Sequence, residues 1–251
     1  MAHSDNINDH FFQGFYKEVW RKLIPAGLSE AEADFIEDIS SLQAGQKVLD
    51  LMCGYGRHAL PLSHRGFQTT AVDNLADYIE EIREKAAQGQ LPLTAVCSRI
   101  IDLKLTETYD AAICMGNSFA FFNSTEAASI LHNISAHLKA GGVFLLNTWM
   151  LGEIAIKHFQ EKEWFYAGEY KYLIDNKYLF YPSRIESEHI IIRNDGATES
   201  IKGVDYIFTI SELEAMLAEA GFSIDAIYAT PRKKAFRLGD TRAYIVAKKQ
   251  L

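Results

Sequence analysis

Residues 48–60 read VLDLMCGYGRHAL, an apolar run followed by two glycines and a helix-forming stretch. A strand that turns through glycines into a helix is typical of nucleoside-binding α/β folds, because glycine lets the backbone bend sharply and approach a ligand closely. The free N–H groups at the start of the helix suit a carboxylate or a phosphate. The stretch therefore predicts a ligand-binding turn at Gly54 and Gly56.

Acidic residues flank this turn on both sides. Asp73 ends the next predicted strand, TTAVDN, where a carboxylate accepts hydrogen bonds from the ribose hydroxyls of an adenosine. Asp50 stands before the glycines, where a buried acid suits a cationic group such as an amine. Ala59 and Leu60 lie near the place of the third glycine of a dinucleotide fingerprint, so a pyrophosphate would be crowded. The pattern favours a sulfonium nucleoside, although nicotinamide and flavin folds share part of it.

Outward from the turn, short apolar runs alternate with helical stretches. The runs KVLDLM, QTTAV, LTAVCS, AAICM and VFLLNTW read as buried strands, with a helix between each pair. This alternation predicts an α/β fold with a parallel sheet and right-handed crossovers. The closing segment continues it. A helix over SELEAMLAEAGF, with a capping box of Ser211 and Glu214, precedes the strands SIDAIYA and AYIVAKK.

Two aromatic segments lie outside this alternation. Residues 8–24 carry an aromatic stripe at helical spacing, which predicts one amphipathic helix. Residues 161–208 have period-two character with turn signals at Asp175-Asn176, Tyr181-Pro182 and Asn194-Asp195-Gly196, which predicts a small antiparallel sheet. We expect three parts: an N-terminal helical cap (1–40), a cofactor-binding core (41–156 and 208–251) and an inserted antiparallel β cap (157–207).

The composition narrows the class of protein. The net charge of −8 over 251 residues disfavours a nucleic-acid partner. The three cysteines show neither CxxC spacing nor Cys/His ligand spacing, so we expect no metal site and no disulfide framework. The start of the chain lacks the features of a signal peptide, and no apolar segment approaches the length of a bilayer span. We expect a cytoplasmic monomer or homodimer without membrane contact.

The stretch VLDLMCGYGRHALPLSHRGFQTTAVDN resembles motif I and the acidic loop of class I S-adenosylmethionine-dependent methyltransferases, in the branch with a CGxGRH signature. The segments FFQGFYKEVWRKLIP, YDAAICMGNSFAFF, LKAGGVFLLNTW and FRLGDTRAYIVAKK also have counterparts there, so the resemblance covers most of the chain. It implies a Rossmann-like, doubly wound, seven-stranded methyltransferase sheet with the inserted β subdomain. It also implies methyl transfer from S-adenosyl-L-methionine to a nitrogen or oxygen of a small molecule, with S-adenosyl-L-homocysteine as product. The alternatives are an NAD(P)-dependent oxidoreductase and a catalytically silent cofactor-binding module.

The resemblance also implies roles for particular residues. Asp50 and the turn backbone would hold the methionine end of the cofactor, and Asp73 the ribose. Met52 stands where the family commonly has glycine, and Arg99 stands where it often has an acid for the adenine amino group. Adenine recognition is therefore expected from the backbone of Arg99 and Ile100. The full set of expected cofactor-binding residues is Tyr16, Trp20, Arg21, Asp50, Met52, Gly54, Gly56, Asp73, Asn74, Arg99, Ile100, Met115, Gly116 and Asn117.

Methyl transfer is an in-line displacement, so the protein has to align a nucleophile and exclude water. The aromatic N-terminal helix and inserted sheet are candidate lids, or simply the cores of small elements. Asn117 and Ser118, after the fourth strand, are the candidates to orient a nucleophile. Tyr206 and Asp205, at the end of the inserted segment, are further candidates for proton removal. Three further side chains either bind an acidic substrate or are surface charges: Arg184, His189 and Arg237.

Overall fold

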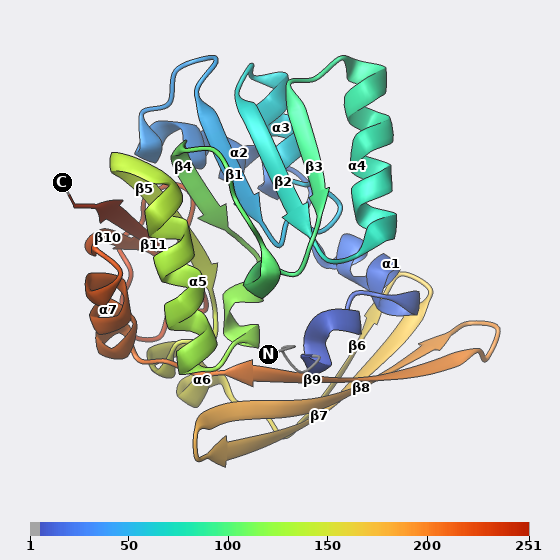
Figure 1. Cartoon of the computed structure of the whole chain (residues 1–251). Helices are drawn as coiled ribbons and strands as arrows, with labels where there is room; N and C mark the ends of the chain where they lie inside the picture. The colour runs from blue at the N-terminus through green and yellow to red at the C-terminus, as the bar shows by residue number, and fades with distance from the viewer. Residues whose placement is uncertain (1–5, 251) are drawn as a thin grey trace.

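The computed structural model describes residues 6–250, and its main feature is a seven-stranded sheet (Figure 1). The strand order is β10-β11-β5-β4-β1-β2-β3. Strands β1 to β5 are parallel, and β11 runs antiparallel to both of its neighbours. The strands are β1 (Lys47–Leu51), β2 (Gln68–Asp73), β3 (Leu93–Cys97), β4 (Tyr109–Cys114), β5 (Leu138–Thr148), β10 (Phe222–Tyr228) and β11 (Ala243–Lys249). The predicted α/β fold with seven strands is confirmed.

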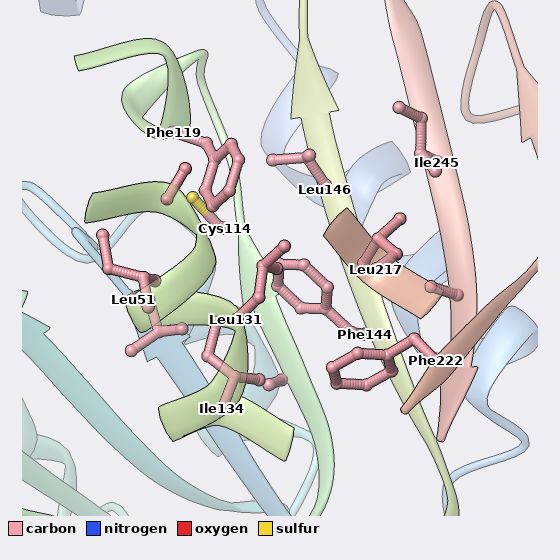
Figure 2. Close-up of a cluster of buried hydrophobic side chains, with 14 of the residues drawn as sticks. Leu51, Cys114, Phe119, Leu131, Ile134, Phe144, Leu146, Leu217, Phe222 and Ile245 are labelled. Atoms are coloured by element: carbon pink, nitrogen blue, oxygen red, sulfur yellow. The ribbon is translucent and has the colours of Figure 1, made fainter. Parts of the chain in front are cut away.

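Helices cover both faces of this sheet because alternate strand residues point to opposite sides. In β5, Phe144 and Leu146 pack with α5 (Ser124–His137) and α7 (Ile210–Glu219), as Figure 2 shows. The alternate residues Val143 and Leu145 pack with α2 (Leu28–Ser40) and α3 (Ala59–His64). Helix α4 (Ala76–Gly89) covers the same face nearer β2 and β3. Both faces are therefore buried, as the near-continuous apolar runs predicted.

A second sheet of four antiparallel strands lies across the carboxyl ends of the parallel strands (Figure 1). Its order is β6-β7-β8-β9, and all three connections are hairpins. The strands are β6 (Lys162–Ala167), β7 (Tyr170–Phe180), β8 (Ser183–Arg193) and β9 (Thr198–Tyr206), preceded by α6 (Gly152–His158). The predicted turn at Asp175-Asn176 is wrong, because both residues lie inside the ladder of β7 with β8. The first hairpin turns instead at residues 168–169, where Gly168 has a φ of +60°.

The predicted helix over residues 8–24 is two elements, η1 (Ile7–His10) and α1 (Gly14–Leu23). Gln13 is extended and Gly14 has a φ of +56°, so the chain bends between them. The carboxylate of Glu199, from β9, accepts a hydrogen bond of 2.6 Å from the backbone N–H of Phe15 at the start of α1. A contact across the fold therefore sets this helix start, which local periodicity does not report. Residues 1–5 of the expected N-terminal cap lie outside the described residues.

Helix α7 begins two residues earlier than the predicted capping box implies. Thr209 is the N-cap, and its side chain and that of Glu212 form the reciprocal bonds of the box. Ser211 and Glu214 have the same spacing in the sequence, so the pattern alone does not choose between them. The choice is made by Glu153 on α6, whose carboxylate accepts a hydrogen bond from the backbone N–H of Ile210.

No helix within residues 6–250 is long and apolar enough to cross a membrane. Over the same residues, no group of three or more His, Cys, Asp or Glu side chains is arranged to hold a metal ion.

Candidate active site

A cavity opens at the carboxyl ends of β1, β2 and β4, beside the glycine turn. Gly54 has a φ of +55°, and a Cβ added there would meet no atom within 4 Å. Gly56 has a φ of +79°, but a Cβ there would lie 2.9 Å from Ile82 of α4. The first glycine thus faces open space, while the second lets the turn pack against a helix. Met52 adopts a φ of +54°, which explains why glycine is common at its place in the family.

Asp73 joins the two sides of the cavity floor. Its Oδ2 accepts a hydrogen bond of 2.8 Å from the N–H of Gly54, and its Oδ1 accepts one of 3.0 Å from the N–H of Leu75. Burial raises the pKa of this carboxyl, and the backbone hydrogen bonds oppose the rise. Each oxygen keeps a further lone pair, so the carboxylate can still accept from two hydroxyl groups.

Asp50 is a buried carboxyl without a side-chain hydrogen-bond partner among the described residues. The residue is 1% exposed, and neither carboxyl oxygen makes a close hydrogen bond there. Burial raises its pKa to about 7, while the charge of Arg57 and the backbone N–H of Ala59 oppose the rise. An unpaired acid in such a place is costly unless a ligand completes it. Asp50 and Arg57 both line the cavity, so this end presents opposite charges side by side.

Arg57 is also part of a buried polar cluster centred on Glu32. Glu32 of α2 is fully buried and pairs with Arg57, with His58 at 3.0 Å and with the Tyr244 hydroxyl at 2.6 Å. Burial alone would raise the pKa of Glu32, but the hydrogen bond and charge of His58 and the charge of Arg57 lower it to about 2. The pKa of His58 falls to about 4 because of burial and Arg57. This cluster ties the glycine turn to α2 and β11.

The far wall of the cavity comes from the loop after β3 and from the N-terminal segment. Arg99 and Ile100 line it, with Arg99 at 3.3 Å from the carboxylate of Asp9. The side chain of Asn74 donates a hydrogen bond of 2.8 Å to the carbonyl of Asp9. The side chain of Asn8 exchanges hydrogen bonds with both the N–H and the carbonyl of Val204 in β9. The sequence predicted Asn74, Arg99 and Ile100 for this wall but not its N-terminal part, because η1 has no motif of its own.

A second chamber adjoins the first and lies under the four-stranded sheet. Four residues line both spaces: Phe12, Trp20, Gly116 and Phe121. A Cβ on Gly116 would lie 3.5 Å from the Trp20 ring, so the two residues mark the junction. The chamber walls are largely aromatic, and include Phe11, Tyr16, Trp149, Phe159, Phe165 and Tyr172.

Asn117 connects the junction to the inserted sheet. Its backbone is left-handed, with a φ of +73°, and its Oδ1 accepts hydrogen bonds from the Thr148 hydroxyl and the Trp149 N–H. Its Nδ2 donates a hydrogen bond of 2.9 Å to Oδ1 of Asp205 in β9. Burial raises the pKa of Asp205 to about 7, and the hydrogen bond from Asn117 opposes the rise. The chamber therefore holds a carboxyl that changes charge near neutral pH.

Asp205 and Tyr206 are neighbours in a strand, so they point to opposite faces of the sheet. Asp205 pairs with Ile185 across the ladder and lines the chamber. Tyr206 pairs with Arg184 and lines neither cavity. Of the two residues that the sequence named for proton removal, Asp205 is thus the one that lines the chamber.

Two of the expected cofactor-binding residues line neither space. Arg21 pairs with Glu81 and lies over the ring of Tyr55, and Gly56 faces α4. The other expected residues divide between the two spaces. The second chamber is lined by Tyr16 and Asn117, and also by the shared Trp20 and Gly116. The first cavity is lined by Trp20, Asp50, Met52, Gly54, Asp73, Asn74, Arg99, Ile100, Met115, Gly116 and Ser118.

Comparison with known proteins agrees with this geometry. Residues 48–142, from the glycine turn to the start of the apolar part of β5, match the family model of the methyltransferase domain. These residues are a methyltransferase domain. The resemblance drawn from motif I is confirmed, and the nicotinamide alternative is not favoured.

Relatives of this methyltransferase domain act on different molecules. A glycine/sarcosine N-methyltransferase from Aphanothece halophytica is 28% identical over 171 residues, which cover 66% of this chain and 64% of that protein. A ubiquinone biosynthesis O-methyltransferase from Rickettsia canadensis is 31% identical over 111 residues, which cover 44% of each. The match thus spans less than two thirds of the length of these relatives.

The fold is shared with solved methyltransferase structures. An S-adenosylmethionine-dependent methyltransferase from Clostridium acetobutylicum superposes with a TM-score of 0.82 at 19% identity, covering 94% of this chain and 97% of that one. An S-adenosylmethionine-bound amino pentose methyltransferase from Micromonospora echinaspora gives 0.70 at 20% identity, covering 99% of this chain and all of that one. At these identities the likeness concerns the fold.

Proposed function

We propose that this chain is an S-adenosylmethionine-dependent methyltransferase that acts on a nitrogen or oxygen of a small molecule. The observation that carries the proposal is the unpaired, buried carboxyl of Asp50 in a cavity that opens at Gly116 into a second, aromatic chamber. One space suits the cofactor and the other the acceptor. The presence of a second chamber favours an enzyme over a silent binding module.

The residues of the first cavity fit the cofactor in chemical terms. Asp50 and Arg57 offer a negative and a positive charge to the ammonium and carboxylate of the methionine end. Asp73 has lone pairs left for the ribose hydroxyls, and residues 98–100 form a wall for the adenine. When bound, the cofactor supplies an electrophilic methyl group on a sulfonium. The junction at Trp20 then offers an aromatic ring to a cationic centre.

The chain itself excludes water and holds the acceptor. The N-terminal segment is tied to the core by the Asn74–Asp9 hydrogen bond and to β9 by the paired bonds of Asn8 with Val204. We infer that residues 1–40 and 157–207 act as caps over a core of residues 41–156 and 208–251. The expected monomer or homodimer state also stays a prediction, which light scattering during size-exclusion chromatography measures.

Calorimetry with S-adenosylhomocysteine tests the proposal. We expect the wild-type protein to bind it and the Asp73→Ala variant to lose binding by at least about 100-fold, because the substitution removes both the ribose acceptor and the anchor of Gly54. Asp77→Ala is the matched control, since Asp77 is an exposed acid of the next helix. Failure of the wild type to bind, together with stabilisation by NADH, would contradict the proposal. Binding without any methylated product across a panel of amines and alcohols would support the silent module.

A further inference from the structure

The charges of the second chamber restrict the acceptor more than the family does. We propose that the acceptor is an amine without a neighbouring carboxylate or phosphate group, which enters as an ammonium ion and is bound and deprotonated by Asp205. This inference rests on the proposed function, because it assigns the molecule that would share the junction with the cofactor.

The first argument is the sign of the charges that line the chamber. Its described lining contains two carboxylates, Asp205 and Glu163, and no Lys or Arg. The arginines expected as candidates for an acidic substrate do not contribute, since Arg184 pairs with Glu186 and Arg237 is exposed. Two arginines lie near the chamber without lining it. Arg242 packs over Trp149 and faces Glu32, and Arg57 lies beside Gly116 on the side of the first cavity, where it pairs with Glu32. An anionic group in the chamber would therefore meet carboxylates and no lining cation.

The second argument is the position of Asp205. Its Oδ1 receives a hydrogen bond from Asn117, and the preceding residue, Gly116, lines both cavities. The carboxylate therefore lies beside the junction, where an acceptor atom has to meet the methyl group. Asn117 is itself held by Thr148, Trp149 and Met150, so Asp205 is held by a fixed partner. Fixed placement of the nucleophile is what an in-line displacement requires.

The third argument is the aromatic wall around Asp205. The ring of Trp20 packs against those of Tyr16 and Trp149, and all three rings line the chamber. Aromatic faces attract a desolvated ammonium, and a carboxylate completes its neutralisation. The neutral body of the amine would then rest against the apolar residues farther in, such as Phe159 and Ile154.

The other titratable groups that face Asp205 are poor bases. Tyr16 from α1 and Tyr172 from β7 are buried, and burial raises the pKa of each hydroxyl above its usual value. Nδ1 of His189 from β8 shares a hydrogen bond with the Tyr172 hydroxyl, and burial lowers the pKa of His189 to about 4. Glu163 from β6 and His158 from α6 complete the titratable lining. Of the two carboxylates, Asp205 is the one that Asn117 holds beside the junction.

The reaction balances with Asp205 as proton acceptor. The ammonium gives one proton to the carboxylate, which frees the lone pair on nitrogen. That pair forms the new bond to the methyl carbon, while the bond from this carbon to sulfur breaks and its electrons stay on sulfur. The product is an N-methylated ammonium ion, and the proton on Asp205 passes to water when the chamber opens.

A hydroxyl acceptor fits the chamber less well. An alcohol brings no positive charge to offset the carboxylates, and its proton is held far more tightly than that of an ammonium ion. An amino acid brings an amine, but its carboxylate would have no positive partner among the described lining residues. The chamber thus differs from one built for an amino acid such as glycine, the acceptor named for one of the relatives.

Matched probes separate these classes. Calorimetry with S-adenosylhomocysteine present would compare 2-phenylethylamine, 2-phenylethanol and L-phenylalanine, and then the benzyl and cyclohexylmethyl amines with their alcohols. We expect at least one amine to bind about tenfold more tightly than its alcohol, and phenylalanine to bind more weakly than 2-phenylethylamine. If no amine exceeds its alcohol, or if phenylalanine binds as tightly as the amine, the inference is overturned.

Variants identify the residue responsible. Asp205→Asn keeps the shape and the acceptor oxygen for Asn117 but removes the charge, so the amine and alcohol affinities should converge. Asp175→Asn is the control, because Asp175 lies in the same sheet, is exposed and pairs with Lys162. If Asp205→Asn leaves the amine preference intact, Asp205 is not the binding group.

A pH series gives a readout that a merely structural role would not move. Because Asp205 has a pKa of about 7, the affinity for an amine that stays protonated should rise as the pH goes from 6 to 8. The step should vanish in Asp205→Asn, and its persistence would assign the titration to another group, such as His158. Since binding of S-adenosylhomocysteine is measured first on each sample, its loss would sink the proposed function, whereas a missing amine preference would sink only this inference.

Discussion

The two cavities of this protein are built in different ways. The first is centred on the glycine turn of residues 48–60, and its other walls come from the segments after β2, β3 and β4 and from the N-terminal segment. The second is assembled from α1, α6, the loop after β4 and all four strands of the inserted sheet. The first thus has a local structure with special backbone angles at its centre, whereas the second is a space between segments that are distant in the chain.

This difference explains why the first cavity could be predicted from the sequence and the second could not. Positive φ angles at Gly54 and Gly56 leave a mark on residue type, because glycine adopts them without a steric penalty. The chamber leaves no such mark, since an aromatic residue can line a ligand space or fill a core equally well. Two proposals can therefore be tested separately: that the first cavity binds the cofactor, and that the second binds the acceptor.

The largest expected effect separates ligand binding from folding at Asp50. We expect Asp50→Asn to weaken S-adenosylhomocysteine by about 100-fold, because a charge partner of the methionine amine is lost. Folding raises the pKa of this carboxyl from 3.8 to about 7, so its contribution to stability is present below pH 4 and is lost as the pH rises to 7.

The unliganded variant should therefore gain stability over the wild type as the pH rises, by about 1–3 kcal/mol at pH 8. Melting temperatures at pH 5 and pH 8 measure this. If Asp50→Asn binds S-adenosylhomocysteine as the wild type does, or if the stability difference shrinks with rising pH, Asp50 does not contact the ligand.

The next effect distinguishes two glycines within the same turn. Gly56→Ala forces a Cβ to within 2.9 Å of Ile82 at a φ of +79°, so we expect a loss of about 2–3 kcal/mol in the free energy of unfolding. In Gly54→Ala the new Cβ meets open space, so we expect the positive φ to lower the free energy of unfolding by about 1 kcal/mol. We expect this variant to bind the cofactor more weakly than Gly56→Ala does. Urea unfolding and calorimetry on both variants provide the measurement. Equal stability losses would mean that the turn has no separate ligand side.

The smallest effect concerns the positioning of Asp205. Removing the Asn117 amide in Asn117→Ala takes away a donor that favours the ionised form, so the pH step of amine binding should move upward by up to about 1 unit. Tyr206→Phe is the comparison, because Tyr206 is on the outer side of the same strand and should leave the step in place. A shift with Tyr206→Phe but not with Asn117→Ala would assign the step to Tyr206, the other residue that the sequence named for proton removal.

The features that could be predicted from the sequence are those that depend on interactions between residues close together in the chain. The parallel sheet and the glycine turn depend on periodicity and on residues close in the chain, and both were predicted. The split between η1 and α1 depends on Glu199, which is 184 residues away from Phe15. The choice of Asp205 over Tyr206 depends on the register of β8 with β9, which a one-residue shift would reverse. Glu32 reads as one acid among several on α2, because only its burial beside Arg57 and Tyr244 sets it apart.

The hydrogen bonds of Asn8 with Val204 have a practical consequence for anyone handling this protein. They hold the N-terminal segment against β9, so the first described residue, Asn6, already lines the cofactor cavity. A purification tag at the amino terminus would therefore join the chain five residues before a wall of the cofactor cavity. The end of β11 lies beside the apolar start of β5, away from the carboxyl ends of the parallel strands where both cavities lie (Figure 1). A carboxyl-terminal tag therefore leaves the site free for the measurements described above.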